Sequence, residues 1–338
     1  MAIISRRNLL ALAAMAPAAS LVTFKVASGA ETADVNMQIG WLGGNGILGE
    51  TIGLKKGFFA DEGLDLQITP GGPNVDGIAA VASGAANFGQ YNSTTSIMLA
   101  RSEGIPIKAF AAGFQKHPFA FVSKKEKPVR TPRDLIGKRI GIQATSLIIL
   151  KALMKLNDIK ESDVEIVTVG PEVAPFITGQ VDVFSLWLTT VSALKTIGDD
   201  RVEMLLWDTG VRIYANLYYA SDKVLAENQE MLVKFTRACA RSWGYAREHP
   251  EEAVDALVEA YPNLDRANEL EASKVVLGFS FNETTKAQGW GFMDPDVWAK
   301  QIATWDSIGE LKGSVPKVED VMTLDILNAT TDIRKQVG

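Results

Sequence analysis

The segment from Val35 to Thr69 constrains the fold of this 338-residue chain more than any other stretch. Residues 35–41 alternate apolar and polar side chains, which is the spacing of a β-strand, and a loop with three glycines follows them. Apolar residues between 47 and 54 then recur at helical spacing, and residues 64–69 alternate again. The segment therefore predicts a β-α-β unit. In an open α/β sheet, ligands bind beyond the carboxyl ends of such strands.

The pattern of strands and helices continues along the chain and suggests two lobes. Phe119–Ser123 and Arg212–Ala220 are extended and apolar, and we interpret them as two strands that cross between the lobes. We expect an α/β fold with one lobe of residues 35–118 plus 220–338 and a second of residues 121–213. Each lobe is expected to hold an open, mostly parallel sheet, and the C-terminal part is expected to be mainly helical.

Four motifs occur in the order and spacing of one protein family: Lys55–Leu66 (KKGFFADEGLDL), Gly84–Gly89 (GAANFG), Thr131–Gly141 (TPRDLIGKRIG) and Gly179–Phe184 (GQVDVF). Through them, about two-thirds of the chain resembles the periplasmic solute-binding proteins of ABC importers for nitrate, sulfonates, taurine and thiamine-pyrimidine precursors. The resemblance implies a type II periplasmic binding protein, with a small ligand held between lobes that close about a hinge. It also implies a monomer that delivers its ligand to ABC permease subunits, makes no bond and needs no cofactor.

The first thirty residues have the pattern of an export signal. Arg6 and Arg7 precede an apolar run from Leu9 to Val22, and small residues at 28–30 suit cleavage. The paired arginines and Lys25 resemble the twin-arginine class, and an ordinary secretory signal is the alternative. We expect a soluble periplasmic protein. Removing these residues takes away three basic groups and no acid, so the formal net charge moves from −6 to −9. Such a charge argues against nucleic acid and anionic membranes as partners.

Catalytic and metal-binding motifs such as G-x-S-x-G, H-E-x-x-H and C-x-x-C do not occur in the sequence. Cys239 is the single cysteine, and His117 and His249 are the two histidines. Gly44–Gly49 matches G-x-G-x-x-G, but the next strand ends at Thr69 without the acid that binds a ribose. These glycines are better suited to close approach of the backbone to a polar ligand group. An exported, cofactor-dependent enzyme is the alternative from another class.

Aromatic residues end three of the expected strands. Trp41, Tyr91 and Trp187 lie where strands reach the open edge, and a ring there can stack on a flat ligand for about 1–3 kcal/mol per base. The alternative is that each ring only covers the core of its own strand. Trp290 is flanked by glycines, and we expect it on a mobile loop that closes over the ligand.

Polar residues at strand ends complete the candidate site. The loop from Gln143 to Ser146 offers hydroxyl and N–H groups to a ligand, or it is a simple helix cap. Glu172 either accepts hydrogen bonds from a heterocycle or is a solvated acid in a first helical turn. His117 has either a structural role at the hinge or a ligand contact. The candidate ligand-binding residues are Trp41, Gly43, Gly44, Asn45, Gly72, Tyr91, Asn92, Ser93, Gln115, His117, Gln143, Thr145, Ser146, Glu172, Trp187, Asn216 and Trp290.

The aromatic strand ends favour a small flat nitrogen heterocycle, such as a pyrimidine precursor of thiamine, as the ligand. Residues 115–118 (QKHP) also resemble the pyrimidine-precursor branch of the family more than its sulfonate branch. The main alternative is a small oxyanion, such as an aliphatic sulfonate, taurine or nitrate. That ligand would depend on backbone N–H groups and on the hydroxyls of Ser93, Thr94, Thr145 and Ser146.

Overall fold

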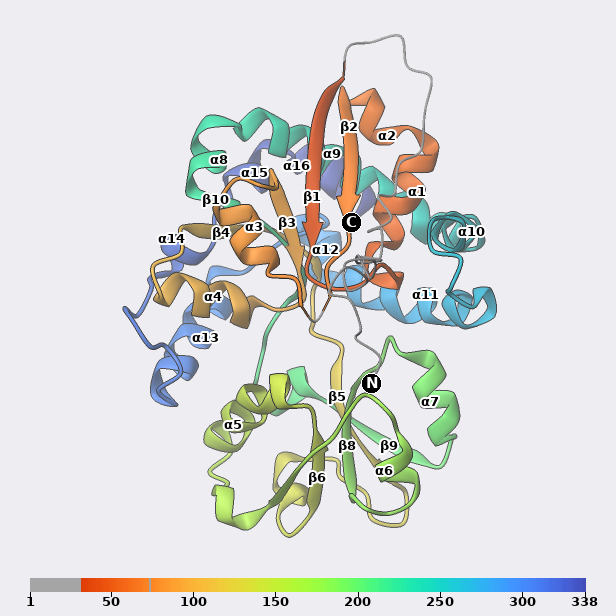
Figure 1. The fold of residues 1–338 in the computed structure, drawn as a ribbon, viewed down its shortest axis with the longest axis vertical. Helices are drawn as coiled ribbons and strands as arrows, with labels where there is room; N and C mark the ends of the chain where they lie inside the picture. Colours follow the sequence, from red (N-terminus) through yellow and green to blue (C-terminus); the bar gives the residue numbers. More distant parts are fainter. Residues whose placement is uncertain (1–31, 73) are drawn as a thin grey trace, which may run out of the picture.

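The computed structural model describes residues 32–72 and 74–338, and it consists of two lobes, each built on a five-stranded sheet (Figure 1). The expected export signal, residues 1–30, lies outside the described residues. Figure 1 shows one lobe above the other, joined by two extended segments. The prediction of a two-lobed α/β fold is confirmed.

The first sheet has the strand order β2-β1-β3-β10-β4. β1 pairs in parallel with both β2 and β3, whereas β10 runs antiparallel to β3 and β4. Parallel strands share one carboxyl edge, so the loops after β1, β2 and β3 open on the same side. The bounds are β1 Ala33–Ile39, β2 Leu64–Thr69, β3 Phe88–Tyr91, β4 Ile107–Phe114 and β10 Ala215–Ser221.

The second sheet repeats this arrangement with the order β7-β6-β8-β5-β9. β6 is parallel to β7 and β8, and β5 runs antiparallel to β8 and β9. Each sheet thus contains one antiparallel strand. The bounds are β5 Phe119–Lys124, β6 Arg139–Ile142, β7 Glu165–Thr168, β8 Val183–Trp187 and β9 Arg201–Leu205.

The two expected crossing strands each belong to one sheet, which corrects their interpretation. Phe119–Ser123 lies within β5 and most of Arg212–Ala220 lies within β10, because an extended apolar segment pairs as soon as it enters a lobe. Residues 115–118 and 210–214 make the crossings themselves. The N–H of His117 donates to the carbonyl of Ile213 at 3.0 Å, so the two crossing segments are hydrogen-bonded. The lobe boundaries stay a prediction.

Helices cover both sheets, and most of them follow β10 in the first lobe, as expected for the C-terminal part (Figure 1). The second lobe contains α5 Leu147–Leu156, α6 Ala174–Ile177 and α7 Val191–Ile197. The first contains α1 Leu48–Lys56, α2 Phe58–Asp61, α3 Gly77–Ala82, α4 Thr94–Ser102, α8 Asp222–Glu227, α9 Gln229–Glu248, α10 Pro250–Ala260, α11 Arg266–Ser280, α12 Glu283–Gln288, α13 Pro295–Ser307, α14 Val318–Val321, α15 Asp325–Ala329 and α16 Thr331–Val337.

Close packing of α1 on α9 accounts for part of the glycine motif. A Cβ atom added at Gly49 would lie 2.5 Å from the ring of Trp243, and one at Gly53 would lie 1.9 Å from Ser242 Oγ. Both distances are shorter than real Cβ contacts, so only glycine lets the two helices approach this closely. The third glycine of the G-x-G-x-x-G match therefore serves helix packing and needs no nucleotide to explain it.

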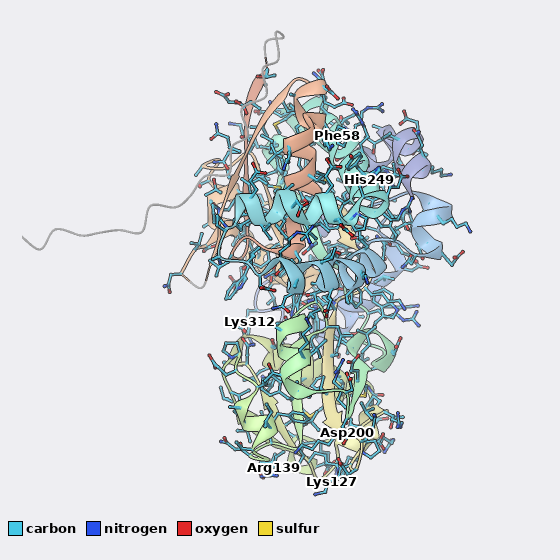
Figure 2. All side chains as sticks on the ribbon, turned by 90° about the vertical axis from the view of Figure 1, so that its right-hand side faces the viewer. Phe58, Lys127, Arg139, Asp200, His249 and Lys312 are labelled. Atoms are coloured by element: carbon cyan, nitrogen blue, oxygen red, sulfur yellow. The ribbon has the colours of Figure 1, made fainter. Side chains whose placement is uncertain are left out.

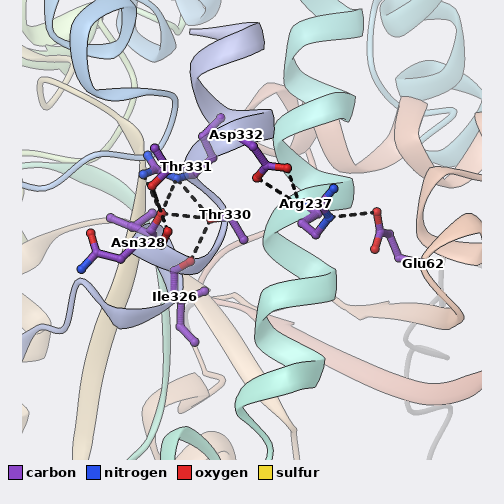
Figure 3. Close-up of polar contacts among 9 residues, drawn as sticks. Glu62, Arg237, Ile326, Asn328, Thr330, Thr331 and Asp332 are labelled. Carbon is purple, nitrogen blue, oxygen red and sulfur yellow. Dashed lines mark hydrogen bonds and ion pairs between the residues drawn. The ribbon is translucent and has the colours of Figure 1, made fainter.

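Ion pairs join helices within the first lobe, including the C-terminal helix α16 (Figure 3). Arg237 on α9 lies between two carboxylates, at 3.0 Å from Asp332 of α16 and 3.5 Å from Glu62. The second lobe contains ion pairs as well, among them Arg139 with Asp182 at 3.0 Å. Arg139 lies at the end of the molecule farthest from the first lobe (Figure 2). These pairs are partly exposed, and each is worth about 0–1 kcal/mol.

Candidate ligand site between the lobes

The ligand-side edges of the two sheets face each other. Asn45, in the glycine loop after β1, donates from Nδ2 to the carbonyl of Thr189 after β8 at 3.4 Å. Beside this contact, α11 of the first lobe lies over α7 of the second (Figure 1), and Lys195 of α7 pairs with Glu271 of α11 at 2.8 Å. The glycine loop thus meets the loop that follows Trp187 across the boundary between the lobes.

Buried amide side chains hold the glycine loop in place. The carbonyl of Gly46 accepts two hydrogen bonds, from Asn216 Nδ2 at 2.7 Å and from Gln90 Nε2 at 2.9 Å. Asn216 has a positive φ of 49°, an uncommon backbone conformation that asparagine tolerates better than most residues. Asn216 was expected to bind ligand. The residue is 2 % exposed and its side chain is hydrogen-bonded to the loop, so the structure gives it a positioning role.

The glycine loop keeps donors free. Among the described residues, the N–H groups of Gly43, Gly44 and Asn45 have no hydrogen-bond acceptor. The loop leads into η1 (Asn45–Ile47) and then α1, where the helix dipole favours negative charge. The loop therefore offers unpaired N–H groups to an acceptor on a ligand, as the sequence suggested.

A buried polar cluster supports α1 directly behind this loop. Tyr218 donates its hydroxyl to Glu50 Oε1 at 2.6 Å, and it accepts from Trp243 Nε1 at 3.2 Å and Cys239 Sγ at 3.5 Å. Glu50 is fully buried, and burial raises the pKa of its carboxyl to about 7. Its Oε2 has no partner among the described residues. Because a buried charge is costly, the carboxyl is protonated over most of the acidic range.

The three aromatic strand ends are accessible to different degrees. Trp41 is 51 % exposed, whereas Tyr91 and Trp187 are partly buried. The ring of Tyr91 packs over Gly40, where a Cβ atom would lie 2.8 Å away. Trp187 meets His117 edge-on at a ring distance of 4.7 Å. Each ring keeps some surface at the ligand-side edge, so the expected stacking role stays a prediction.

Two residues near the glycine loop escaped the sequence analysis. The ring of Tyr261, which follows α10, packs over Gly43, where a Cβ atom would lie 1.9 Å from Cε1. Its hydroxyl has no partner among the described residues. Glu269 on α11 lies close to Asn45, and burial raises the pKa of its carboxyl while the Asn45 hydrogen bond lowers it. Both reach the site from helices more than 200 residues along the chain, and nothing in the local sequence marks them.

The corresponding loop of the second lobe is built differently. Residues 144–146 form a short 3-10 helix, η3, before α5, and neither helix start has a side-chain cap. Thr145 is exposed, and Gln143 and Ser146 are partly exposed. Among the described residues, the N–H groups of Ala144 and Thr145 have no acceptor. In contrast, Ser93 caps α4 by accepting from the N–H of Thr95 at 3.2 Å. Ser93 is therefore a helix cap, whereas no side chain of residues 143–146 caps a helix, which speaks against the simple-cap alternative for that loop.

The prediction of a mobile loop around Trp290 is wrong. The Trp290 side chain is fully buried, with its ring 5.9 Å from Tyr218 and 6.3 Å from Trp243. Its backbone is also held, because the N–H donates to the carbonyl of Arg334 at 3.0 Å and the carbonyl accepts from the Arg334 guanidinium at 2.8 Å. Trp290 belongs to the core of the first lobe.

The expected site residues at the hinge are also buried. Gln115 is 3 % exposed and donates from Nε2 to the carbonyl of Phe292 at 3.0 Å, so it anchors the first crossing segment rather than meeting a ligand. His117 is 2 % exposed, and its Nδ1 accepts from the N–H of Phe119 at 3.2 Å. Burial lowers the pKa of His117 to about 3, so the ring is neutral near pH 7. These contacts support the structural role, and a ligand contact of His117 stays a prediction.

The remaining candidates lie on the loops at the same edges. Glu172 is exposed, which matches the solvated-acid alternative rather than a buried carboxylate. Asn92 is partly exposed beside the capped start of α4. Gly72 is buried, with a φ of 150°, and a Cβ atom added there would lie 3.6 Å from Leu42. Direct ligand contacts of these residues stay predictions.

Residues 32–72 and 74–338 contain no group of three or more histidine, cysteine, aspartate or glutamate side chains arranged to hold a metal ion. Within the same residues, no helix has both the length and the apolar character needed to cross a bilayer.

Comparison with known proteins identifies relatives of two kinds. The chain is 27 % identical over 274 residues to the riboflavin-binding protein RibY of Chloroflexus aurantiacus, covering 78 % of each chain. It is 26 % identical over 293 residues to the formylaminopyrimidine-binding protein of Halalkalibacterium halodurans, covering 83 % of this chain and 85 % of the relative. A 4-amino-5-hydroxymethyl-2-methylpyrimidine phosphate synthase of Legionella pneumophila is 23 % identical over 225 residues, covering 63 % of this chain and 69 % of the relative.

Solved structures and a family model complete the comparison. A putative periplasmic sulfonate-binding protein, SsuA of Methylobacillus flagellatus, matches with a TM-score of 0.66 and 16 % identity, covering 90 % of this chain and 96 % of that one. This likeness shows the shared periplasmic binding protein fold. The model of the NMT1/THI5-like family matches residues 46–253, which is more than half of the chain. The protein therefore belongs to the NMT1/THI5-like family.

Proposed function

We propose that this protein is the exported solute-binding component of an ABC importer and that it binds a small flat nitrogen heterocycle of the pyrimidine-precursor class between its lobes. The observation that carries the proposal is the pairing of accessible aromatic rings with free N–H groups at the same edge. Trp41 is half exposed at the end of β1, and the N–H groups of residues 43–45 follow it directly. The formylaminopyrimidine- and riboflavin-binding relatives both take nitrogen heterocycles, which supports this ligand class.

Stacking and hydrogen bonding are sufficient for a useful affinity. Rings such as Trp41 and Trp187 contribute about 1–3 kcal/mol each when a flat ligand stacks on them. N–H groups at both lobes donate to ring nitrogens or carbonyls of the heterocycle, and the Glu269 carboxyl near Asn45 is placed to accept from an amino group. A micromolar affinity corresponds to about −8 kcal/mol, which these contacts reach after the cost of ordering the lobes.

Binding without chemistry is the favoured mode of action. The synthase relatives mean that enzymes also occur in this family, so we weigh the residues that chemistry would use. Cys239 is buried, and burial raises its pKa well above the ordinary value, which removes the reactive thiolate. His117 is buried and neutral, since burial lowers its pKa to about 3. Delivery to a permease on the periplasmic side follows from the same proposal.

A small oxyanion is the second candidate ligand. The observation that favours it is the set of unpaired N–H groups at residues 43–45 and 144–145, together with the exposed hydroxyl of Thr145. Helix starts of this kind bind sulfonate or nitrate oxygens without any aromatic ring.

Substitution of Trp187 separates the two ligands. For a heterocycle, Trp187→Ala weakens binding tenfold or more, about 1.4 kcal/mol, because one stacking face is lost. For an oxyanion, the same change has little effect. Calorimetric titration of wild type and variant with pyrimidines and with sulfonates measures the affinity for each ligand class. Phe58→Ala is the matched control, because Phe58 is also a partly buried aromatic residue but lies in the outer part of the first lobe (Figure 2).

A further inference from the structure

A cavity lies at the hinge, on the side of α13. It occupies about 50 Å³ between the returning crossing segment, residues 210–213, and the α13 residues Lys300, Gln301, Thr304 and Trp305. A water molecule needs roughly 10–15 Å³ of such volume, so the cavity accepts a group of about three to five non-hydrogen atoms. One of its walls belongs to the first lobe and the other is the connection from the second lobe.

Two buried donors line this cavity without acceptors. Trp305 is fully buried, and its Nε1–H, which can only donate, has no partner among the described residues. Gln301 is 4 % exposed, and its Oε1 accepts from the hydroxyl of Thr94. This leaves Gln301 Nε2 without a partner in the described part of the chain. Unsatisfied buried donors cost about 1–3 kcal/mol each, so an acceptor in the cavity would be stabilised.

Backbone donors add to the same wall. The crossing residues Val211 and Ile213 are 3 % and 0 % exposed. Within the described ranges, neither of their N–H groups has an acceptor. The carbonyl of Ile213 is already used, because it accepts from the N–H of His117. Buried N–H groups without partners are rare in native proteins, and here two belong to the crossing segment that lines the cavity.

The charges at the rim have one sign. Arg212 and Lys300 are exposed at the cavity, and no carboxylate of the described residues lies within ion-pair distance of either. No acidic residue lines the cavity. The larger cavity of about 240 Å³ elsewhere in the first lobe differs, because Lys108 lines it together with Asp222 and Asp325. In a chain of formal net charge −6, the hinge cavity is a local excess of donors and positive charge.

We propose that the hinge cavity is a binding site for a small oxyanion, such as inorganic phosphate or sulfate. The donors of Gln301 and Trp305 and the charges of Arg212 and Lys300 match a ligand that only accepts hydrogen bonds. The anion contacts α13 and the crossing segment together, so its occupancy is coupled to the hinge angle. By linkage, it therefore shifts the affinity of the site between the lobes, and the ligand of that site shifts the affinity for the anion by the same factor. This inference does not rest on the identity of the inter-lobe ligand.

The indole N–H resonances of 15N-labelled protein test the proposal directly. Triple-resonance spectra assign the Trp305 resonance without any substitution in the core. Titration with inorganic phosphate, against sodium chloride of equal ionic strength, is expected to shift the Trp305 resonance saturably. Arg212→Gln with Lys300→Gln is expected to weaken this phosphate affinity at least tenfold, since two charge-assisted contacts are lost. Both residues are exposed, so the double variant is expected to fold.

Matched variants separate this site from the one between the lobes. Arg133→Gln with Lys274→Gln removes the same charges from exposed positions away from the cavity and is expected to leave the Trp305 titration unchanged. Thr145→Ala is also expected to leave it unchanged, whereas phosphate bound between the lobes would lose its contact with the exposed Thr145 hydroxyl and bind more weakly. No phosphate-specific shift of Trp305, or an undiminished shift in the Arg212/Lys300 variant, overturns the proposal.

Discussion

The glycine loop after β1 and the loop of residues 143–146 after β6 offer similar donors on different supports. In the first lobe, the carbonyl of Gly46 is fixed by Asn216 and Gln90, and the ring of Tyr261 covers Gly43. In the second lobe, residues 143–146 carry no side-chain cap, and Thr145 is exposed. A fixed loop pays little ordering cost when it binds, whereas a loosely held loop adapts. The difference suggests that ligand docks first on the first lobe and that the second lobe closes over it.

The largest expected effect is a pH dependence of stability that arises from Glu50, which lies behind the first-lobe loop. Burial raises the pKa of Glu50 from 4.5 to about 7, so the folded protein holds this proton more tightly than the unfolded chain. The contribution of this group to the free energy of unfolding therefore falls by roughly 3 kcal/mol as pH rises from about 4.5 to 7. Above pH 7 this contribution no longer changes. Glu50→Gln removes this loss, so the variant gains stability relative to wild type between pH 5 and pH 8. Urea unfolding of both proteins at pH 5 and pH 8 measures this difference in stability.

The pH comparison has an internal control in His117. Its lowered pKa contributes stability that is present above pH 6.5 and is lost as pH falls toward 3, and this contribution is the same in wild type and variant. The difference between the two proteins therefore reports Glu50 alone. An equal pH dependence in both proteins would mean that Glu50 is not held neutral.

The next largest effect removes the amide under the glycine loop. Asn216→Ala takes away the hydrogen bond to Gly46 and leaves an alanine at a φ of 49°, so we expect a loss of about 1–3 kcal/mol in the free energy of unfolding. We also expect weaker ligand binding, because the loop donors are no longer fixed. Chemical denaturation and calorimetry measure the two effects. Unchanged affinity in the folded variant would show that the support of this loop does not matter for binding.

The smallest effect concerns the second-lobe loop. Thr145 is exposed and caps no helix, so Thr145→Ala is expected to change stability by less than about 0.5 kcal/mol. We expect a loss of ligand affinity of a few-fold, since only one hydroxyl is removed. A stability loss as large as that of Asn216→Ala would remove the distinction between the two loops. Thermal unfolding beside a ligand titration gives both values.

The sequence predicted the two lobes and the ligand-side loops because strand periodicity and glycine positions act locally. The glycine loop after residue 41 and the loop at 143–146 lie at strand ends in the structure as expected. Trp290 was misplaced because the positive φ angles of its flanking glycines, 90° and 82°, mark turns but do not show whether the ring between them is buried. Tyr261 and Glu269 reach the site from distant helices, so only the tertiary fold brings them there.

The amides of Gln115 and Asn216 show a second limit. A polar residue at a strand end can meet a ligand or hold a loop, and the residue type is the same in both cases. In this fold, both side chains donate hydrogen bonds to backbone carbonyls: Gln115 to that of Phe292 and Asn216 to that of Gly46. The choice depends on which carbonyls the fold leaves within reach, and that information is not local.

Release of a bound molecule from the purified mature protein tests the central claim most directly. Protein prepared without added ligand is unfolded, and the released small molecules are examined by mass spectrometry and ultraviolet absorbance. We expect a stoichiometric nitrogen heterocycle, or, if the site is empty as purified, a thermal shift with added pyrimidines that Trp187→Ala reduces. Release of a sulfonate or nitrate, or stabilisation by these anions alone, would contradict the claim that the aromatic strand ends bind a heterocycle.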